Sequence, residues 1–337
     1  MAGERQLIAA LRRLFGPSPA GVSCGIGDDT AVLTPEPGQD LLWTIDTLVE
    51  GIHFDLSYTP LLDLGWKALA VNLSDIAAMG GVPQSALVSL GWPPQRELTQ
   101  ALELAQGLQE AAQAYGTAII GGDTVAAPAG VLLSVTVLGR LAGGTALRRC
   151  GAQAGDGVYV TGPLGLAAAG LASRRHGLEL PAAEAALLLR SLLRPRPQLA
   201  AGRLLAERRL ATAAIDLSDG VASDLAQICQ ESGVGAVLWA GAVPIPDAVQ
   251  EVARQLHQDP LDLALKGGED YQLLFTVPPD HQEAAAAAFQ QAGLAPPFCL
   301  GRITAEPGIR LVHPHGERPL AADGFDHFPD ARLADQG

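Results

Sequence analysis

Residues 97–138, ELTQALELAQGLQEAAQAYGTAIIGGDTVAAPAGVLLSVTVL, decide the fold class of this chain. Glu97–Tyr115 repeats apolar residues at intervals of three or four, which predicts an amphipathic helix. Thr117–Ile120 and Val131–Leu138 are rich in β-branched residues and are separated by Gly-Gly-Asp and a proline-containing loop, so we predict two strands. A helix and strands in one continuous stretch indicate a mixed α/β domain.

The same mixture continues on both sides of this stretch. Upstream, Leu41–Ile45 is predicted to be a strand, and Leu61–Met79 a helix that Gly80, Gly81 and Pro83 terminate. Downstream, we predict strands at Val158–Thr161, Ala213–Leu217, Leu273–Val277 and Leu300–Thr304, and helices at Ala183–Leu193, Pro197–Arg208, Gln282–Ala292 and from about Val221.

The length of 337 residues is enough for about two domains. Gly139–Gly157 is rich in glycine and precedes a new strand, which predicts a boundary near residue 145. The expected fold is therefore α/β (α+β), with two mixed domains at residues 1–145 and 146–330 and a tail at 331–337.

Charge and hydropathy exclude several classes of partner. Asp plus Glu number 36 against 22 Lys plus Arg, and the net charge of −14 repels nucleic acid and anionic lipid surfaces. No apolar stretch is long enough to span a membrane, and the N-terminus lacks the pattern of a signal peptide. The four cysteines are scattered, which argues against a zinc site or a disulfide framework. We expect a soluble, cytoplasmic protein without nucleic-acid or membrane partners.

Acidic residues recur next to glycines and at the ends of predicted strands. They are Asp28, Asp29, Asp46, Asp123, Asp216 and Asp219. Each alone reads equally well as a turn or a helix cap. Asp75 differs, because it lies in an otherwise apolar helix and needs a partner if that helix is buried.

If these carboxylates converge, cations must neutralise them. Hard oxygen ligands select Mg²⁺, Mn²⁺ or Ca²⁺, and Mg²⁺ is usually shared with substrate phosphates. The chain contains no phosphate-binding loop with Gly-Lys-Ser/Thr, no complete dinucleotide fingerprint and no protein-kinase motif set. A phosphate site must therefore be built in another way.

Six motifs, taken together and in order, resemble the thiamine-monophosphate kinase (thiamine-phosphate kinase) family of the aminoimidazole-ribotide-synthetase-like superfamily. They are Gly25-Ile26-Gly27-Asp28-Asp29, Asp46-Thr47-Leu48-Val49-Glu50-Gly51-Ile52-His53-Phe54, the run Lys67–Gly80, Gly121-Gly122-Asp123-Thr124, Asp216-Leu217-Ser218-Asp219-Gly220 and Gly267-Gly268-Glu269-Asp270-Tyr271. The terminal Gly324–Phe328 is also similar.

The resemblance implies an N-terminal ATP-binding and dimerisation domain of the superfamily type and a C-terminal α/β domain. It implies transfer of the γ-phosphoryl group of ATP to thiamine monophosphate, giving thiamine diphosphate, by direct in-line attack with several Mg²⁺ ions and without a phosphoenzyme. It also implies a homodimer.

The resemblance assigns site residues to three groups. Those similar to metal ligands are Asp29, Thr44, Asp46, Asp75, Asp123, Asp216 and Asp219, with Asp28 as a supporting acid. Those similar to ATP contacts are Gly122, Asp123, Arg149 and Ser218. Those similar to contacts with thiamine monophosphate are His53, Glu269 and Phe325. Without the resemblance, His53 reads as a packed or capping histidine, Phe325 as a core residue and Arg149 as a surface charge.

Two positions depart from the family pattern. Ile45 stands where a hydroxyl residue is usual, so either a backbone carbonyl serves there or one metal is held more weakly. Phe325 stands where tryptophan or tyrosine is common, which alters ring stacking. Two alternatives stay open at this point: a related ATPase with another acceptor, such as a selenophosphate-synthetase-like enzyme, and a non-catalytic nucleotide-binding module.

Overall fold

The computed structural model describes residues 36–322 throughout, together with Leu11, residues 13–16, the backbone of residues 22–24 and 32–33, and Gly324. The chain forms two compact units. The first comprises Met1–Leu147 and Leu193–Arg209, and the second comprises Arg148–Leu192 and Leu210–Gly337. Each unit mixes helices and strands, so the predicted α/β fold class is confirmed.

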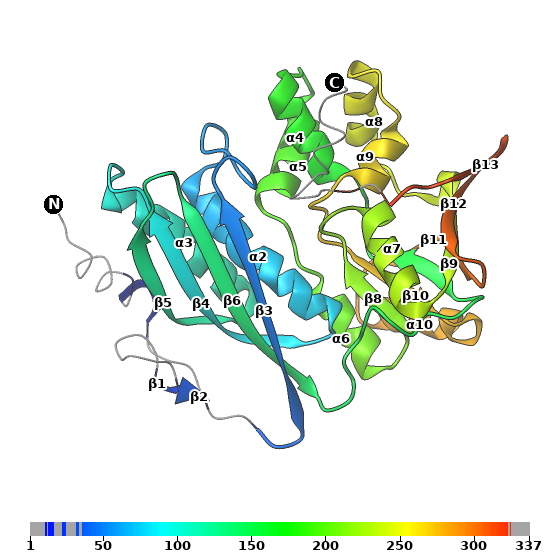
Figure 1. The fold of residues 1–337 in the computed structure, drawn as a ribbon, viewed down its shortest axis with the longest axis horizontal. Helices are drawn as coiled ribbons and strands as arrows, with labels where there is room; N and C mark the ends of the chain where they lie inside the picture. Colours follow the sequence, from blue (N-terminus) through cyan, green and yellow to red (C-terminus); the bar gives the residue numbers. More distant parts are fainter. Residues whose placement is uncertain are drawn as a thin grey trace. The chain divides into compact units, whose positions relative to one another are not determined.

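The first unit is built on a four-stranded sheet in the order β3-β6-β4-β5, with helices α2 and α3 on one face (Figure 1). β6 runs antiparallel to β3 and β4, whereas β4 and β5 are parallel. The elements are β3 (Gln39–Val49), α2 (Leu61–Ala78), β4 (Val82–Trp92), α3 (Leu98–Tyr115), β5 (Ala118–Ala126), β6 (Leu132–Ala142) and α6 (Leu199–Glu207). A separate antiparallel pair joins β1 (Val22–Cys24) and β2 (Val32–Leu33).

The two faces of the four-stranded sheet have different surroundings. Along β3, Leu42 and Leu48 pack toward the core under α2, while the alternate residues Trp43, Ile45 and Thr47 point the other way. We call the face opposite α2 and α3 the outer face. Its exposed large apolar side chains are Leu41, Trp43, Ile45, Leu87, Val125 and Leu132.

Helices α2 and α3 approach each other closely because glycines meet the facing backbone at two points. A Cβ atom on Gly65 would lie 2.0 Å from the carbonyl oxygen of Leu104, and one on Gly107 would lie 1.8 Å from that of Leu62. Any larger residue at either position would force the helices apart. This crossing holds α2 rigidly over the sheet, which matters because α2 carries Asp75.

The segment Leu193–Arg209 is fastened to the first unit by side-chain contacts. The indole nitrogen of Trp66 donates to the carbonyl oxygen of Pro195 over 3.0 Å. The Arg194 guanidinium pairs with Asp63 and with Glu110, 3.1 Å away in the second case, and lies 5.2 Å from the ring centre of Trp66. The chain thus returns to the first unit after it has begun the second.

The second unit contains a seven-stranded sheet in the order β13-β12-β9-β11-β7-β10-β8. Helix α7 contacts strands β8, β9, β10 and β12, and its apolar face fills the core of this unit. The strands are β7 (Gly157–Val160), β8 (Ala213–Asp216), β9 (Gly235–Trp239), β10 (Leu273–Val277), β11 (Phe298–Thr304), β12 (Gly308–His313) and β13 (Gly316–Pro319). The α-helices are α4 (Leu166–His176), α5 (Ala182–Leu193), α7 (Val221–Ser232), α8 (Asp247–Gln255), α9 (Pro260–Lys266) and α10 (Gln282–Gln291). Two short 3-10 helices are η1 (Ala240–Ala242) and η2 (Pro279–His281).

The predicted elements named above are confirmed, most of them with bounds shifted by a few residues. One prediction needs correction: β5 continues past Ile120 to Ala126, so Gly121, Gly122 and Asp123 lie within the strand and do not separate two strands. The strands and α-helices that the sequence did not predict are β1, β2, β4, β9, β12, β13, α4, α8 and α9. Within the described part of the chain, no helix is long and apolar enough to cross a membrane.

Candidate functional site

Strand β3 and helix α2 bring the side chains of Thr44, Asn72 and Asp75 together with the backbone of Asp46. The Thr44 hydroxyl donates a short hydrogen bond to the Asp75 carboxylate. The backbone N–H of Asp46 donates to the Asn72 side-chain oxygen over 3.0 Å, and Asn72 in turn donates to the carbonyl oxygen of Ala68. Thr44, Asp46 and Asp75 are half-buried, whereas Asn72 is fully buried. The half-buried acid of the apolar helix, Asp75, therefore has a hydrogen-bond partner.

Strand alternation and helix spacing explain this arrangement. Thr44 and Asp46 share the face of β3 that looks toward α2, because they are two residues apart. Asn72 and Asp75 are three residues apart on α2 and so share one helix face. Ile45 lies between the two β3 residues, points to the outer face and is 63% exposed. Its side chain is thus on the opposite side of the sheet from Thr44 and Asp75.

Asp123 lies on the outer face of the same sheet. The strand register pairs Asp123 with Ser89 and Thr124 with Leu90, and Leu90 belongs to the core. Asp123 therefore points away from α2, and it is exposed. The structure does not bring its side chain together with those of Thr44 and Asp75. At the neighbouring Gly122, a Cβ atom would lie 1.9 Å from the carbonyl oxygen of Val88, so close strand pairing alone requires glycine there.

His53 closes the turn that follows β3. The imidazole Nδ1 of His53 accepts the backbone N–H of Val49 over 3.1 Å, and the backbone N–H of His53 donates to the Val49 carbonyl oxygen. Because Nδ1 accepts, the proton of the neutral imidazole is on Nε2. The capping role that the sequence allowed is present, and the predicted contact with a substrate remains untested.

In the second unit, the end of β8 lies beside the Gly-Gly-Glu-Asp-Tyr segment. The backbone N–H of Glu269 donates to the carbonyl oxygen of Ser218 over 2.8 Å, and that of Tyr271 donates to Leu217. Glu269 and Tyr271 have φ angles of 66° and 48°, a left-handed conformation that costs a side-chain-bearing residue about 1–3 kcal/mol. Such strain is concentrated at functional sites. The structure thus joins Glu269 to the segment that carries Asp216, Ser218 and Asp219.

A buried carboxylate that the sequence analysis missed supports this segment. Asp224 is 0% exposed, and its carboxylate accepts the backbone N–H groups of Asp219 and Gly220 at 3.2 and 3.1 Å. Burial, together with the charge of Asp219, raises the pKa of Asp224 to about 7. The exposed Arg149 reaches the same group through Gln227. The only feature of the sequence that could have indicated Asp224 is its position four residues after Gly220, a glycine that starts a helix.

Asp270 belongs to the Gly-Gly-Glu-Asp-Tyr segment and connects it to the start of α4. Its carboxylate accepts the N–H of Gly165 over 2.8 Å, at the N-terminus of α4. The pKa of Asp270 is raised to about 7, chiefly by burial and also by the charge of Glu269. Hydrogen bonds from the backbone of Gly165, Ala167 and Leu166 act in the opposite direction and lower this pKa. A negative charge at a helix N-terminus is stabilised by the free N–H groups there.

The remaining predicted residues cannot be placed. Asp28, Asp29 and Phe325 lie outside the described residues. Among the side chains that the structure describes, no group of three or more His, Cys, Asp or Glu is close enough to hold a metal ion. What the first unit provides is a set of hard oxygen donors on β3 and α2, of the kind that Mg²⁺ prefers.

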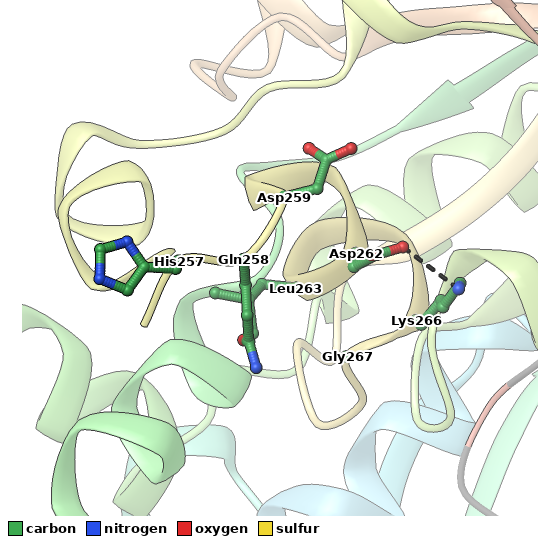
Figure 2. A pocket seen from close by; sticks show the side chains of 7 residues that line it. All are labelled: His257, Gln258, Asp259, Asp262, Leu263, Lys266 and Gly267. Atoms are coloured by element: carbon green, nitrogen blue, oxygen red, sulfur yellow. Dashed lines mark ion pairs between the residues drawn. The ribbon is translucent and has the colours of Figure 1, made fainter. Parts of the chain in front are cut away.

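An open cavity of about 580 Å³ is lined by residues of the second unit that come just before Glu269 in the sequence (Figure 2). Lys266 and Asp262 form an ion pair of 3.2 Å beside it, and Asp259 caps α9 by accepting the N–H of Leu261. None of the predicted site residues lines it, and we assign it no function. Its lining residues are His257, Gln258, Asp259, Asp262, Leu263, Lys266 and Gly267.

Comparison with known proteins relates both units to a single family. Residues 27–141 match the AIR synthase related protein N-terminal domain, and residues 153–314 match the C-terminal domain of the same description. The chain is 41% identical over 335 residues to a thiamine-monophosphate kinase of Salmonella typhimurium, covering 97% of this chain and 98% of that protein.

Two solved structures agree with that relationship. The thiamine-monophosphate kinase from Stenotrophomonas maltophilia K279a is 37% identical with a TM-score of 0.80, over 90% of this chain and 94% of that one. A structure of AaThiL complexed with AMPPCP and TMP is 30% identical with a TM-score of 0.76, over 97% of each chain.

Proposed function

Because the chain belongs to the thiamine-monophosphate kinase family, we propose that it catalyses the ATP-dependent phosphorylation of thiamine monophosphate to thiamine diphosphate. The relationship includes both units and the strand, helix and turn that carry the acidic motifs. The observation that carries the proposal within this structure is the cluster of Thr44, Asp46 and Asp75, held by Asn72 at the contact between β3 and α2.

The reaction requires no protein nucleophile. A phosphate oxygen of thiamine monophosphate is ionised at neutral pH and attacks the γ-phosphorus of ATP directly, while the bond to the β-phosphate oxygen breaks and ADP leaves. The protein then has to position two anions and neutralise their charge. An acidic protein with a net charge of −14 does this poorly without cations.

We propose that Mg²⁺ ions supply that neutralisation at the phosphate oxygens. The donors present in the structure fit this metal, because hydroxyl and carboxylate oxygens are hard ligands. The residues that would hold the ions are Asp29, Thr44, Asp46, Asp75, Asp123, Asp216 and Asp219. Ile45 takes no part through its side chain, which carries no oxygen and points away from Thr44 and Asp75.

The substrate contacts follow the same assignment. Gly122, Asp123, Arg149 and Ser218 would contact ATP, with the Arg149 guanidinium suited to a phosphate. His53, Glu269 and Phe325 would contact thiamine monophosphate, where an acid favours the positive thiazolium ring and an aromatic side chain stacks on it. The strained backbone at Glu269 supports a functional role for that residue.

The apolar outer face supports a homodimer formed through the first unit. Trp43 is 67% exposed and Ile45 63%, and they lie on the same face as Leu41, which gives an apolar stripe on β3, the edge strand of the sheet within the described residues. Two copies related by a two-fold axis would bury this stripe against itself. Asp123 shares this face, so dimerisation would bring it near the second copy.

The test is to measure ADP formation by the purified protein with MgATP and each of three acceptors: thiamine monophosphate, thiamine and selenide. We expect turnover with thiamine monophosphate alone. Asp46→Asn should remove turnover while the circular dichroism spectrum and the thermal midpoint are kept. Asp40→Asn, at an exposed position of the same strand, is the matched control and should retain activity. Turnover with selenide alone, or with no acceptor, would contradict the proposal.

A further inference from the structure

The turn before α7 is held by a residue four positions further along the helix. Gly220 is the N-cap of α7 and has no side chain with which to cap it. The buried carboxylate of Asp224 instead accepts the N–H groups of Asp219 and Gly220 at 3.2 and 3.1 Å. Two backbone donors that the helix leaves unpaired are thereby satisfied, and the direction of the Ser218–Gly220 turn is fixed.

Gln227, one helical turn later, bridges this carboxylate to Arg149. The Nε2 amide of Gln227 donates to the Asp224 Oδ1 over 3.3 Å, and its Oε1 accepts from the Arg149 Nη1 over 2.6 Å. A carboxylate can only accept and a guanidinium can only donate, so a single amide orientation satisfies both neighbours. Because the amide nitrogen of Gln227 donates to Asp224, its oxygen is presented to Arg149.

The backbone of Arg149 is fastened to the same helix independently. The hydroxyl of Ser232, at the end of α7, donates to the Arg149 carbonyl over 3.3 Å and accepts the N–H groups of Gly151 and Ala152. Ser232 thus holds the main chain beside Arg149, whereas Gln227 contacts the Arg149 guanidinium.

From these contacts we propose that Asp224 and Gln227 are positioning residues that together orient the Ser218–Gly220 turn and the Arg149 side chain for ATP binding. The inference rests on the proposed function, in which Ser218 and Arg149 contact ATP and Asp219 holds a metal. It identifies two further residues that act through those groups without touching the nucleotide themselves.

An exchange of carboxylate and amide between the two positions tests the coupling. In Asp224→Asn, the new amide can still accept the two backbone N–H groups, but it offers an N–H to Gln227. Gln227 must then turn its oxygen inward and its NH₂ group toward Arg149, which loses its acceptor. In the double variant Asp224→Asn/Gln227→Glu, the carboxylate at 227 accepts from both neighbours, and the total charge is unchanged.

The kinetic readout is the KM for ATP compared with kcat, in full-length protein at saturating thiamine monophosphate. We expect Asp224→Asn and Gln227→Leu each to raise the KM by on the order of 10-fold with a smaller change in kcat. The double variant should return to within about threefold of the wild type. Gln230→Leu, at an exposed position of the same helix, is the control and should have no effect. A purely structural role would lower thermal stability without rescue by the exchange.

Calorimetric binding of a non-hydrolysable ATP analogue with Mg²⁺ separates this inference from the proposed function. Weaker binding by the single variants, with recovery in the double variant, supports the inference even if the wild type does not phosphorylate thiamine monophosphate. Equal binding by all variants of an active enzyme overturns the inference alone. A double variant that binds no better than Asp224→Asn overturns it as well.

Discussion

The hydroxyl group of Thr44 donates a hydrogen bond to the carboxylate of Asp75, a residue 31 positions later in the chain. The contact joins the middle of strand β3 to helix α2. A hydroxyl that already donates to a carboxylate keeps its lone pairs for another partner, such as a cation.

Loss of this hydroxyl should weaken metal binding. We expect Thr44→Val to raise the Mg²⁺ concentration for half-maximal activity by about 10-fold, and Asp75→Asn to lower kcat by on the order of 100-fold, because oxygen donors to the ion are removed. The measurement is ADP formation over a Mg²⁺ titration. Thr47→Val removes a hydroxyl from the outer face of the same strand and is the control. If Thr44→Val and Thr47→Val behave alike, the assignment of Thr44 is wrong.

A charge on the outer face should weaken self-association. We expect Trp43→Glu to shift a dimer toward monomer by at least about 10-fold in its dissociation constant, since a carboxylate cannot be buried unpaired at an apolar contact. Sedimentation velocity over a range of concentrations measures this. Leu187→Glu introduces the same charge at another exposed apolar residue and should not alter association. A monomeric wild type would refute the dimer.

Substitution of Gly122 should destabilise the first unit. A Cβ atom there would lie 1.9 Å from the Val88 carbonyl oxygen, so β4 and β5 must separate. We expect Gly122→Ala to lower the free energy of unfolding by about 2–4 kcal/mol. Gly241→Ala is the control, because nothing lies within 4 Å of its added carbon. Urea denaturation of both variants measures the difference, and equal midpoints would contradict the strand register.

The carboxyl group of Asp270 should make stability depend on pH. Its pKa of about 7 in the folded protein is above that of an unfolded chain, about 4, so the folded state keeps a proton that the unfolded state has lost. The contribution of Asp270 to the free energy of unfolding therefore falls as the pH rises from about 4 to about 7.

The variant Asp270→Asn should remove that part of the pH dependence, up to about 1.4 kcal/mol per pH unit. Denaturation midpoints at several pH values between about 4 and about 8 provide the measurement. Asp280→Asn, at an exposed acid, serves as the control. A slope unchanged in Asp270→Asn would show that Asp270 is ionised throughout this range.

The helices and strands whose apolar residues recur at a clear period could be predicted from the sequence. Those in which glycine and proline obscure the period could not. Helix α3 was predicted within one residue of its start, because its apolar stripe is regular. Strand β4 was missed because Gly80, Gly81 and Pro83 read as the end of a helix. Pro83 is accommodated there beside a register shift near the start of the strand.

For the candidate site, the sequence indicated which residues to examine but not the side of the sheet on which each lies. The sequence indicated that Asp75, an acid in an apolar helix, needs a partner if the helix is buried, and Thr44 provides one. The face of Asp123 could not be counted from the sequence, because a bulge opposite Ala86 and Leu87 shifts the alternation along β5. Asp224 was missed because an acid in the first turns of a helix is ordinary there.

The return of Leu193–Arg209 to the first unit has a consequence for how the protein is made and how it can evolve. On the ribosome, the first unit has all its parts only after Arg209 has emerged, when β7, α4 and α5 of the second are already outside. The first unit therefore cannot be completed before part of the second has been made. A gene rearrangement that exchanges either one needs three junctions, at 147/148, 192/193 and 209/210, so neither unit is a cassette that a single crossover can transfer.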